Sequence, residues 1–134
     1  MTKIIDGKDA VLGRLATYVA KEAMKGEEIV ILNSEQVIIT GNKTQIKKDF
    51  LEKRTKIGSG QKGPKYSRSS DKIVKRAIRG MLPNHRHGRG RDAFNRIRCY
   101  VGIPAEYVSA KKIIAGKEKP SKFIQIKLMT KHKD

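Results

Sequence analysis

Apolar positions in the first thirty residues change from strand-like to helix-like spacing. Residues 3–5 form a short apolar run that predicts a strand, and the turn-prone residues 6–9 close it. In residues 12–23 the apolar side chains recur every three or four positions, which predicts a helix with one buried face. We expect Asp9 to cap the start of this helix and Gly26 to end it.

Residues 29–32 are a continuous apolar run, which is typical of a strand covered on both faces. Strand, helix and strand in this order predict a right-handed parallel crossover. Residues 37–39 predict a further short strand, and residues 40–42 offer caps for a second helix. The apolar side chains of that helix are Ile46, Phe50 and Leu51.

A third helix is predicted over residues 71–82, with Ser70 as its cap and Pro83 as its stop. At about 100° per residue, one face collects five apolar side chains: Ile73, Val74, Ala77, Ile78 and Met81. The opposite face collects four cations: Lys72, Lys75, Arg76 and Arg79. We therefore expect this helix to be anchored in the core on one side and to present the four cations rigidly, as a unit, on the other.

Two basic segments lack a regular apolar period. Residues 58–70 form a loop rich in Gly, Ser and Lys, and residues 84–98 form an arm with two histidines and five arginines. We expect both segments to be disordered in the free protein and to become ordered on binding a partner. Residues 99–101 predict a last strand of the sheet, and the pattern assigns no element to residues 103–134.

Positive charge is concentrated in the middle third of the chain. The 134 residues carry a formal net charge of +18, from 31 Lys and Arg against 13 Asp and Glu. Residues 1–52 are neutral overall, residues 53–98 carry +13 and residues 99–134 carry +5. From Arg76 to Arg98 every basic residue is arginine, whose planar guanidinium suits phosphates and stacks on bases. Such an excess calls for a polyanionic partner, and it favours nucleic acid over a merely soluble basic surface.

The sequence argues against several other classes of protein. No stretch approaches the roughly 18 apolar residues of a membrane-spanning helix, and residues 1–6 lack the apolar run of a secretion signal. The predicted third helix has no Trp or Phe on its apolar face, so packing on a sheet is favoured over lying on a membrane. Cys99 is the single cysteine, which agrees with a reducing compartment. We expect one intracellular domain spanning residues 1–134.

One glycine-rich string resembles a nucleotide-binding motif. Residues 58–63 match G-x-G-x-x-G, but they follow a helical, basic segment instead of a strand, and they run into Pro64. The P-loop pattern fails as well, because Pro64 stands where lysine is required. These glycines either let the backbone approach phosphates or simply make a mobile loop.

No pattern of residues indicates a metal site or a catalytic centre. His85, His87, Cys99 and His132 lack the paired spacing of zinc ligands, and the arginines around the first two repel a cation. We expect these two histidines to stack on RNA or to hydrogen-bond to it. Cys99 is expected to be a small buried hydrophobe, because no positioned base is indicated. Carboxylates are nearly absent among the cations, which disfavours metal-dependent hydrolysis or phosphotransfer. We expect no cofactor, no small-molecule substrate and no enzymatic activity.

Four strings, in consistent order, resemble the universal large-subunit ribosomal protein 13 family. They are Val11-Leu12-Gly13-Arg14-Leu15-Ala16, Thr40-Gly41-Asn42-Lys43, Ala77-Ile78-Arg79-Gly80-Met81-Leu82-Pro83 and Tyr100-Val101-Gly102. The last five residues of the third string are the most specific. Residues 85–91 resemble the archaeal and eukaryotic branch, and the short length favours the archaeal type. Bacterial members differ around residues 56–68, so contacts of that loop cannot be transferred from them.

The resemblance implies a three-layer α/β/α domain with a small, mostly parallel central sheet. The charge pattern adds two basic extensions to this domain, a loop at about residues 56–70 and an arm at about residues 84–98. The resemblance also implies a structural constituent of the large ribosomal subunit in the cytoplasm. Such a protein binds and stabilises large-subunit rRNA early in assembly, beside neighbouring ribosomal proteins. The alternative is a nucleic-acid-processing enzyme or a nucleic-acid-binding factor outside the ribosome.

Recognition is expected to be mostly of phosphates, sugars and RNA shape, since only Tyr66 and Phe94 are available to stack on bases in the basic third. The residues expected to bind rRNA are Lys56, Lys62, Lys65, Arg68, Lys72, Lys75, Arg76, Arg79, His85, Arg86, His87, Arg89, Arg91, Arg96 and Arg98.

Overall fold

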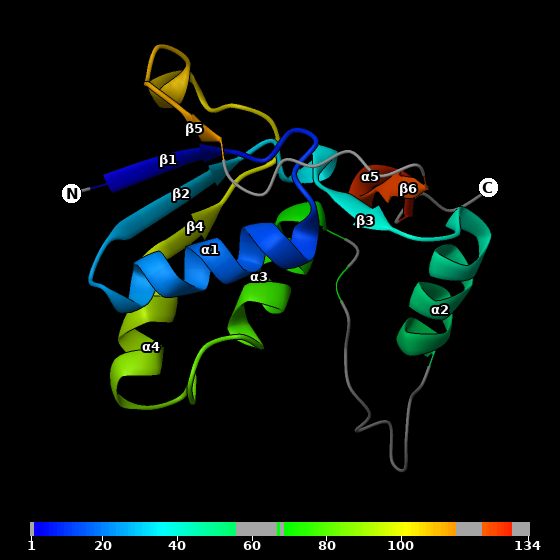
Figure 1. The fold of residues 1–134 in the computed structure, drawn as a ribbon, viewed down its shortest axis with the longest axis horizontal. Coiled ribbons are helices and arrows are strands. Elements are labelled where there is room, and N and C mark those ends of the chain that lie inside the picture. The colour runs from blue at the N-terminus through cyan, green and yellow to red at the C-terminus, as the bar shows by residue number, and fades with distance from the viewer. Residues whose placement is uncertain (1, 56–66, 68, 115–121, 130–134) are drawn as a thin grey trace.

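The computed structural model describes residues 2–55, 67, 69–114 and 122–129, which form a mixed α/β fold (Figure 1). The strands are β1 (Thr2–Asp6), β2 (Glu28–Leu32), β3 (Ile38–Thr40), β4 (Ile97–Cys99), β5 (Ile113–Ile114) and β6 (Phe123–Gln125). The α-helices are α1 (Leu12–Met24), α2 (Lys43–Thr55), α3 (Ser70–Arg79), α4 (Gly88–Asn95) and α5 (Ile126–Met129). Short 3-10 turns include η1 (Ser34–Gln36) and η3 (Ala105–Tyr107).

The central sheet is parallel throughout. Its strand order is β4-β2-β1-β5, and β1 aligns with β2 so that Ile5 lies opposite Ile31. The parallel pairing predicted across β1, α1 and β2 is therefore confirmed. The expected class, an α/β domain with a mostly parallel central sheet, is confirmed too, in agreement with a three-layer architecture. β3 lies outside this sheet and pairs antiparallel with β6, an element that the sequence pattern did not assign.

β2 lies at the centre of the core. Its Ile29 and Ile31 belong to the same buried cluster as Ile97 of β4 and the apolar face of α1. Because side chains alternate along a strand, Val30 and Leu32 point to the opposite face of the sheet, and both are buried there. The apolar run therefore forms a strand covered on both faces, as predicted.

Helix α1 ends as its sequence indicates. The N–H of Gly26 donates to the carbonyl of Ala23 (3.1 Å), and the N–H of Glu27 donates to the carbonyl of Glu22 (3.3 Å). These two bonds, with Gly26 at φ 97°, make a Schellman ending, which favours glycine at this position. The predicted role of Gly26 is confirmed.

The start of α1 differs from the prediction. Val11 occupies the cap position with extended backbone and makes no side-chain cap bond. Asp9 has φ 60° in the preceding turn, where its N–H donates to the carbonyl of Gln36 (3.2 Å). Asp9 as the cap was therefore wrong, because the turn that connects β1 to α1 takes up this residue.

Helix α2 stands beside the body of the molecule (Figure 1). Asn42 caps it, since its Oδ1 accepts the N–H groups of Thr44 (3.0 Å) and Gln45 (3.4 Å). Ile46 and Phe50 are half-buried against the core, whereas Leu51 is 47% exposed. The helix and its cap were predicted correctly, but Leu51 does not belong to its buried face.

Helix α3 is anchored by Val74 and Ile78, which are both fully buried. Its cap position is Ser69, whose hydroxyl contacts the Asp71 carboxylate, so Ser70 was wrongly assigned as the cap. The helix also ends at Arg79, before the predicted boundary. Met81 consequently lies outside the helix and is 46% exposed, so it does not share the buried face.

The arm predicted over residues 84–98 contains two regular elements that the apolar pattern did not predict, and a turn at residues 84–87 precedes them. The arm contains α4 and β4, and β4 pairs with β2 along Ile97–Cys99, two residues before the predicted strand. Gly90 explains the docking of α4: a Cβ there would lie 1.5 Å from the carbonyl oxygen of Pro83. The apolar pattern does not predict this close packing of α4 on the preceding turn, because the segment is rich in arginine and glycine.

We predict that Gly90→Ala lowers the free energy of unfolding by about 1–3 kcal/mol, because the added methyl forces α4 away from Pro83. Gly13→Ala is the control. Gly13 lies in α1 with open space around it, so alanine should stabilise the protein by about 0.5–1 kcal/mol. Urea unfolding followed by circular dichroism measures both variants, and equal stability of Gly90→Ala and the unsubstituted protein would contradict the packing argument.

Candidate nucleic-acid interface

Helix α3 turns its cations away from the buried contact that it makes with α1. Lys72 is exposed, and Lys75, Arg76 and Arg79 are half-buried. Half-burial of long basic side chains is expected where their stems lie along apolar surface while the charged ends reach water. The prediction of an apolar face opposite a cationic one is confirmed for Val74 and Ile78, which are buried, whereas Ile73 and Ala77 are only half-buried.

Phe94 of α4 links α3 to the turn that follows it. The Lys75 Nζ lies 4.8 Å from the centroid of the Phe94 ring, in cation–π geometry. The His85 ring meets the same ring edge to face, with centroids 6.3 Å apart. The Phe94 ring thus already contacts two basic side chains. These contacts disfavour the predicted stacking of this ring on RNA bases.

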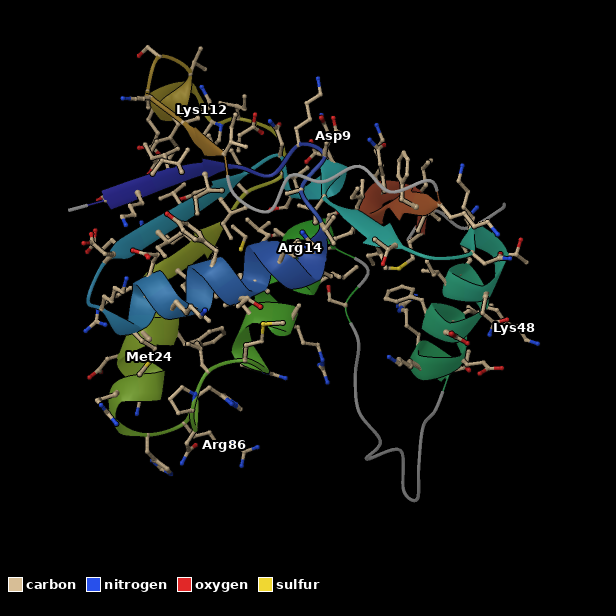
Figure 2. The ribbon with its side chains drawn as sticks, viewed as in Figure 1. Asp9, Arg14, Met24, Lys48, Arg86 and Lys112 are labelled. Atoms are coloured by element: carbon tan, nitrogen blue, oxygen red, sulfur yellow. The ribbon has the colours of Figure 1, made fainter. Side chains whose placement is uncertain are left out.

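The turn between α3 and α4 extends the positive charge. Arg86, His87, Arg89 and Arg91 are exposed, and Figure 2 shows Arg86 in the lower part of the view, below α1. Asp92 is the one acidic residue of α4. In the described part of the chain, no carboxylate pairs with Lys72, Lys75, Arg79 or these three arginines.

We define the α3–α4 basic surface by the predicted rRNA-binding residues that these elements bring together. They are Lys72, Lys75, Arg76, Arg79, His85, Arg86, His87, Arg89 and Arg91.

Two predicted rRNA-binding residues lie elsewhere. Arg96 Nη1 donates to the carbonyl oxygen of Ala23 (2.9 Å), so this guanidinium satisfies the C-terminal end of α1. Arg98 lies between Ile97 and Cys99, which pack toward the core, so its side chain points to the opposite face of the sheet. Neither side chain joins the α3–α4 basic surface. Lys56, Lys62, Lys65 and Arg68 lie outside the described residues, as does Tyr66.

Cys99 is partly buried against the core. Burial of its thiol raises the pKa to about 12, and the charge of Lys75 only partly opposes this shift. The thiol is therefore protonated at neutral pH, and the neighbouring Arg98 does not activate it. The interpretation of Cys99 as a small hydrophobe agrees with this environment.

A groove that the sequence pattern did not predict lies between α2 and α3. It has a volume of about 690 Å³, and its lining is mostly apolar. Helix α2 contributes Ile46, Asp49, Phe50 and Lys53, and α3 contributes residues that include Lys72, Ile73 and Arg76. The spacing of Ile46, Phe50 and Lys53 predicts that they lie on one side of α2. The sequence does not show which element this side faces, so the groove could not be predicted from it.

The described residues offer little for other kinds of site. No three His, Cys, Asp or Glu side chains gather closely enough there to hold a metal ion. No helix among those residues is long and apolar enough to cross a membrane.

Lys and Arg side chains clustered along helices are the electrostatic feature expected of proteins that bind the nucleic-acid backbone. Comparison with known proteins then identifies the family. The family model described as ribosomal protein L13 matches residues 1–106, and the chain belongs to this family.

Similar proteins carry the name large ribosomal subunit protein uL13. The one from Methanocaldococcus jannaschii is 44% identical over 132 residues, which cover 96% of this chain and 95% of the relative. The one from Methanopyrus kandleri is 50% identical over 101 residues, covering 75% of this chain and 62% of the relative. The one from Methanococcus maripaludis is 48% identical over 104 residues, covering 75% of each chain. These relatives are archaeal, as the resemblance implied.

We predict a pH dependence of binding that arises at His85. Its pKa lies below the ordinary value of 6.5, first because partial burial disfavours the charged ring and then because Arg79 and Arg86 repel it. The lowered pKa means that the folded protein loses stability as the pH falls below 6.5. A bound polyanion would offset the repulsion and raise this pKa, so affinity should increase as the pH falls through this range.

NMR titration of the His85 ring, with and without RNA, measures both pKa values. His85→Gln is the control and should lose this part of the pH dependence. An unchanged His85 pKa in the complex would place the RNA away from this residue.

Proposed function

We propose that the protein is a structural constituent of the large ribosomal subunit that binds and stabilises large-subunit rRNA through the α3–α4 basic surface. The observation that carries the proposal is a set of cations on α3, on α4 and in the turn between them, all held by helices that are docked on the core. Among the described residues, no carboxylate pairs with Lys72, Lys75, Arg79, Arg86, Arg89 or Arg91. The name of the relatives supports the subunit, since each is called a large ribosomal subunit protein.

The chemistry of the surface favours recognition of the RNA backbone. Arginine guanidinium groups make paired hydrogen bonds to phosphate oxygens, and such contacts fix position without depending on base sequence. Fixed cations on helices suit a folded RNA whose phosphates are also fixed in space. The protein's contribution is therefore to neutralise and hold converging phosphates, which fits a role early in assembly, beside neighbouring ribosomal proteins.

The proposal is for a structural protein of the cytoplasmic ribosome, without catalytic activity. Ribosomal protein families are structural rather than catalytic, and the chain belongs to one of them. The pKa of Cys99, raised by burial, agrees with this, because it leaves the thiol protonated and non-nucleophilic at neutral pH.

We predict that Arg86→Glu, Arg89→Glu and Arg91→Glu together prevent incorporation into large subunits while the protein stays folded. All three side chains are exposed, so the reversal removes phosphate contacts without disturbing the core. With large-subunit rRNA fragments, the slope of log affinity against log salt should fall by about 2–3, at about 0.7–0.9 per lost contact.

The matched control reverses three exposed lysines of α2, Lys43, Lys47 and Lys48, and changes the net charge equally. Sedimentation of cell lysate through a high-salt wash measures incorporation, and circular dichroism checks folding. If the arginine variant sediments with large subunits as well as the lysine control does, the surface assignment is wrong.

A further inference from the structure

The α2–α3 groove combines an apolar floor with a charged rim. Ile46 and Phe50 of α2 face Ile73 and Ala77 of α3 across it. Its volume of about 690 Å³ lies within the range of roughly 300–1,000 Å³ that is usual for small-ligand sites. It therefore has room for a planar group of the size of a nucleobase.

The rim supplies the charges that a nucleotide requires. Lys53 and Lys72 line the groove from opposite helices, and both are exposed, with no ion pair shown among the described residues. Asp49 is the single carboxylate of the lining, and Gln45 Nε2 donates to its Oδ1 (2.9 Å). The Asp49 carboxylate can still accept further hydrogen bonds, and the other charged side chains of the lining are cations.

The groove also continues the α3–α4 basic surface. Lys72, Lys75, Arg76 and Arg79 belong to that surface and line the groove at the same time. A strand whose phosphates lie along α3 therefore reaches the groove without leaving the cationic surface.

We propose that this groove binds one unstacked nucleotide of the RNA and prefers a base with an exocyclic amino group. The base packs on the apolar side chains, Lys53 and Lys72 contact its flanking phosphates, and the amino group donates to Asp49. An acidic protein segment would match the lysines but would be repelled by Asp49, whereas an amino-bearing base uses both. The proposal rests on the proposed function, because the same RNA occupies both surfaces.

The base preference is tested with the full chain and two hexaribonucleotides, of cytidine and of uridine. These bases differ where cytosine carries an amino donor and uracil a carbonyl acceptor. The hexacytidylate should bind about fivefold or more tightly, which corresponds to one good directional contact. In Asp49→Asn, which replaces the carboxylate by a group that also donates, the preference should disappear.

The phosphate contact is tested with two matched variants of α2. Lys53 lines the groove, whereas Lys48 points away from the body of the molecule (Figure 2). Lys53→Gln should reduce the slope of log affinity against log salt by about 0.7, the value for one phosphate of a single strand. Lys48→Gln should leave the slope unchanged.

An unchanged cytidine preference in Asp49→Asn, or equal slopes for the two lysine variants, would overturn the proposal. A photo-crosslinker at position 50 adds a test in assembled large subunits: attachment to RNA supports the proposal, and attachment to protein, or no attachment, contradicts it. Asp49, Lys53 and position 50 lie outside the α3–α4 basic surface, so these outcomes leave the proposed function standing. That function fails separately, through the arginine reversal described above.

Discussion

The burial of Val74 and Ile78 against α1 determines the direction in which the positive charge of this protein faces. These two side chains are fully buried in the cluster that contains Leu15 and Val19 of α1. Because α3 cannot rotate without exposing them, its four cations are held on the outer side of the helix. A modest apolar contact thus positions charges that would otherwise repel one another and spread apart.

The turn after α3 transmits this constraint to α4. Gly90 lies against the carbonyl of Pro83, and Phe94 packs beneath Lys75 and beside His85. These contacts place Arg86, Arg89 and Arg91 on a docked helix and its preceding turn. For the proposed function, cations on a docked helix and turn would lose less backbone entropy when RNA binds than cations on a disordered segment.

Not every basic residue of the middle third belongs to the α3–α4 basic surface. Arg96 donates to the carbonyl of Ala23 and completes α1, and Arg98 points to the other face of the sheet. In contrast, Asp49 and Lys53 line a groove beside α3. Asp49 belongs to the neutral segment of residues 1–52, and Lys53 is the first residue after that segment. Charge density along the sequence is therefore an imperfect guide to the surface that the charges form.

The sequence by itself determined the local structure where one short segment carries the whole signal. The run at Ile29–Leu32 needs two covered faces, Gly26 suits a left-handed helix ending, and Asn42 caps α2 through its own neighbours. The separation of apolar from cationic positions on α3 is equally local, since it follows from the 3.6-residue period.

Only the tertiary structure decided what depends on residues far apart in the chain. Gly90 meets Pro83, Arg96 meets Ala23, β3 pairs with β6, and the groove forms between two helices that are separated in the sequence by residues 56–69. Periodicity reports which face of an element is apolar, but not which element covers it. For that physical reason the cationic helix could be predicted from the sequence, whereas the ordered α4 and the groove could not.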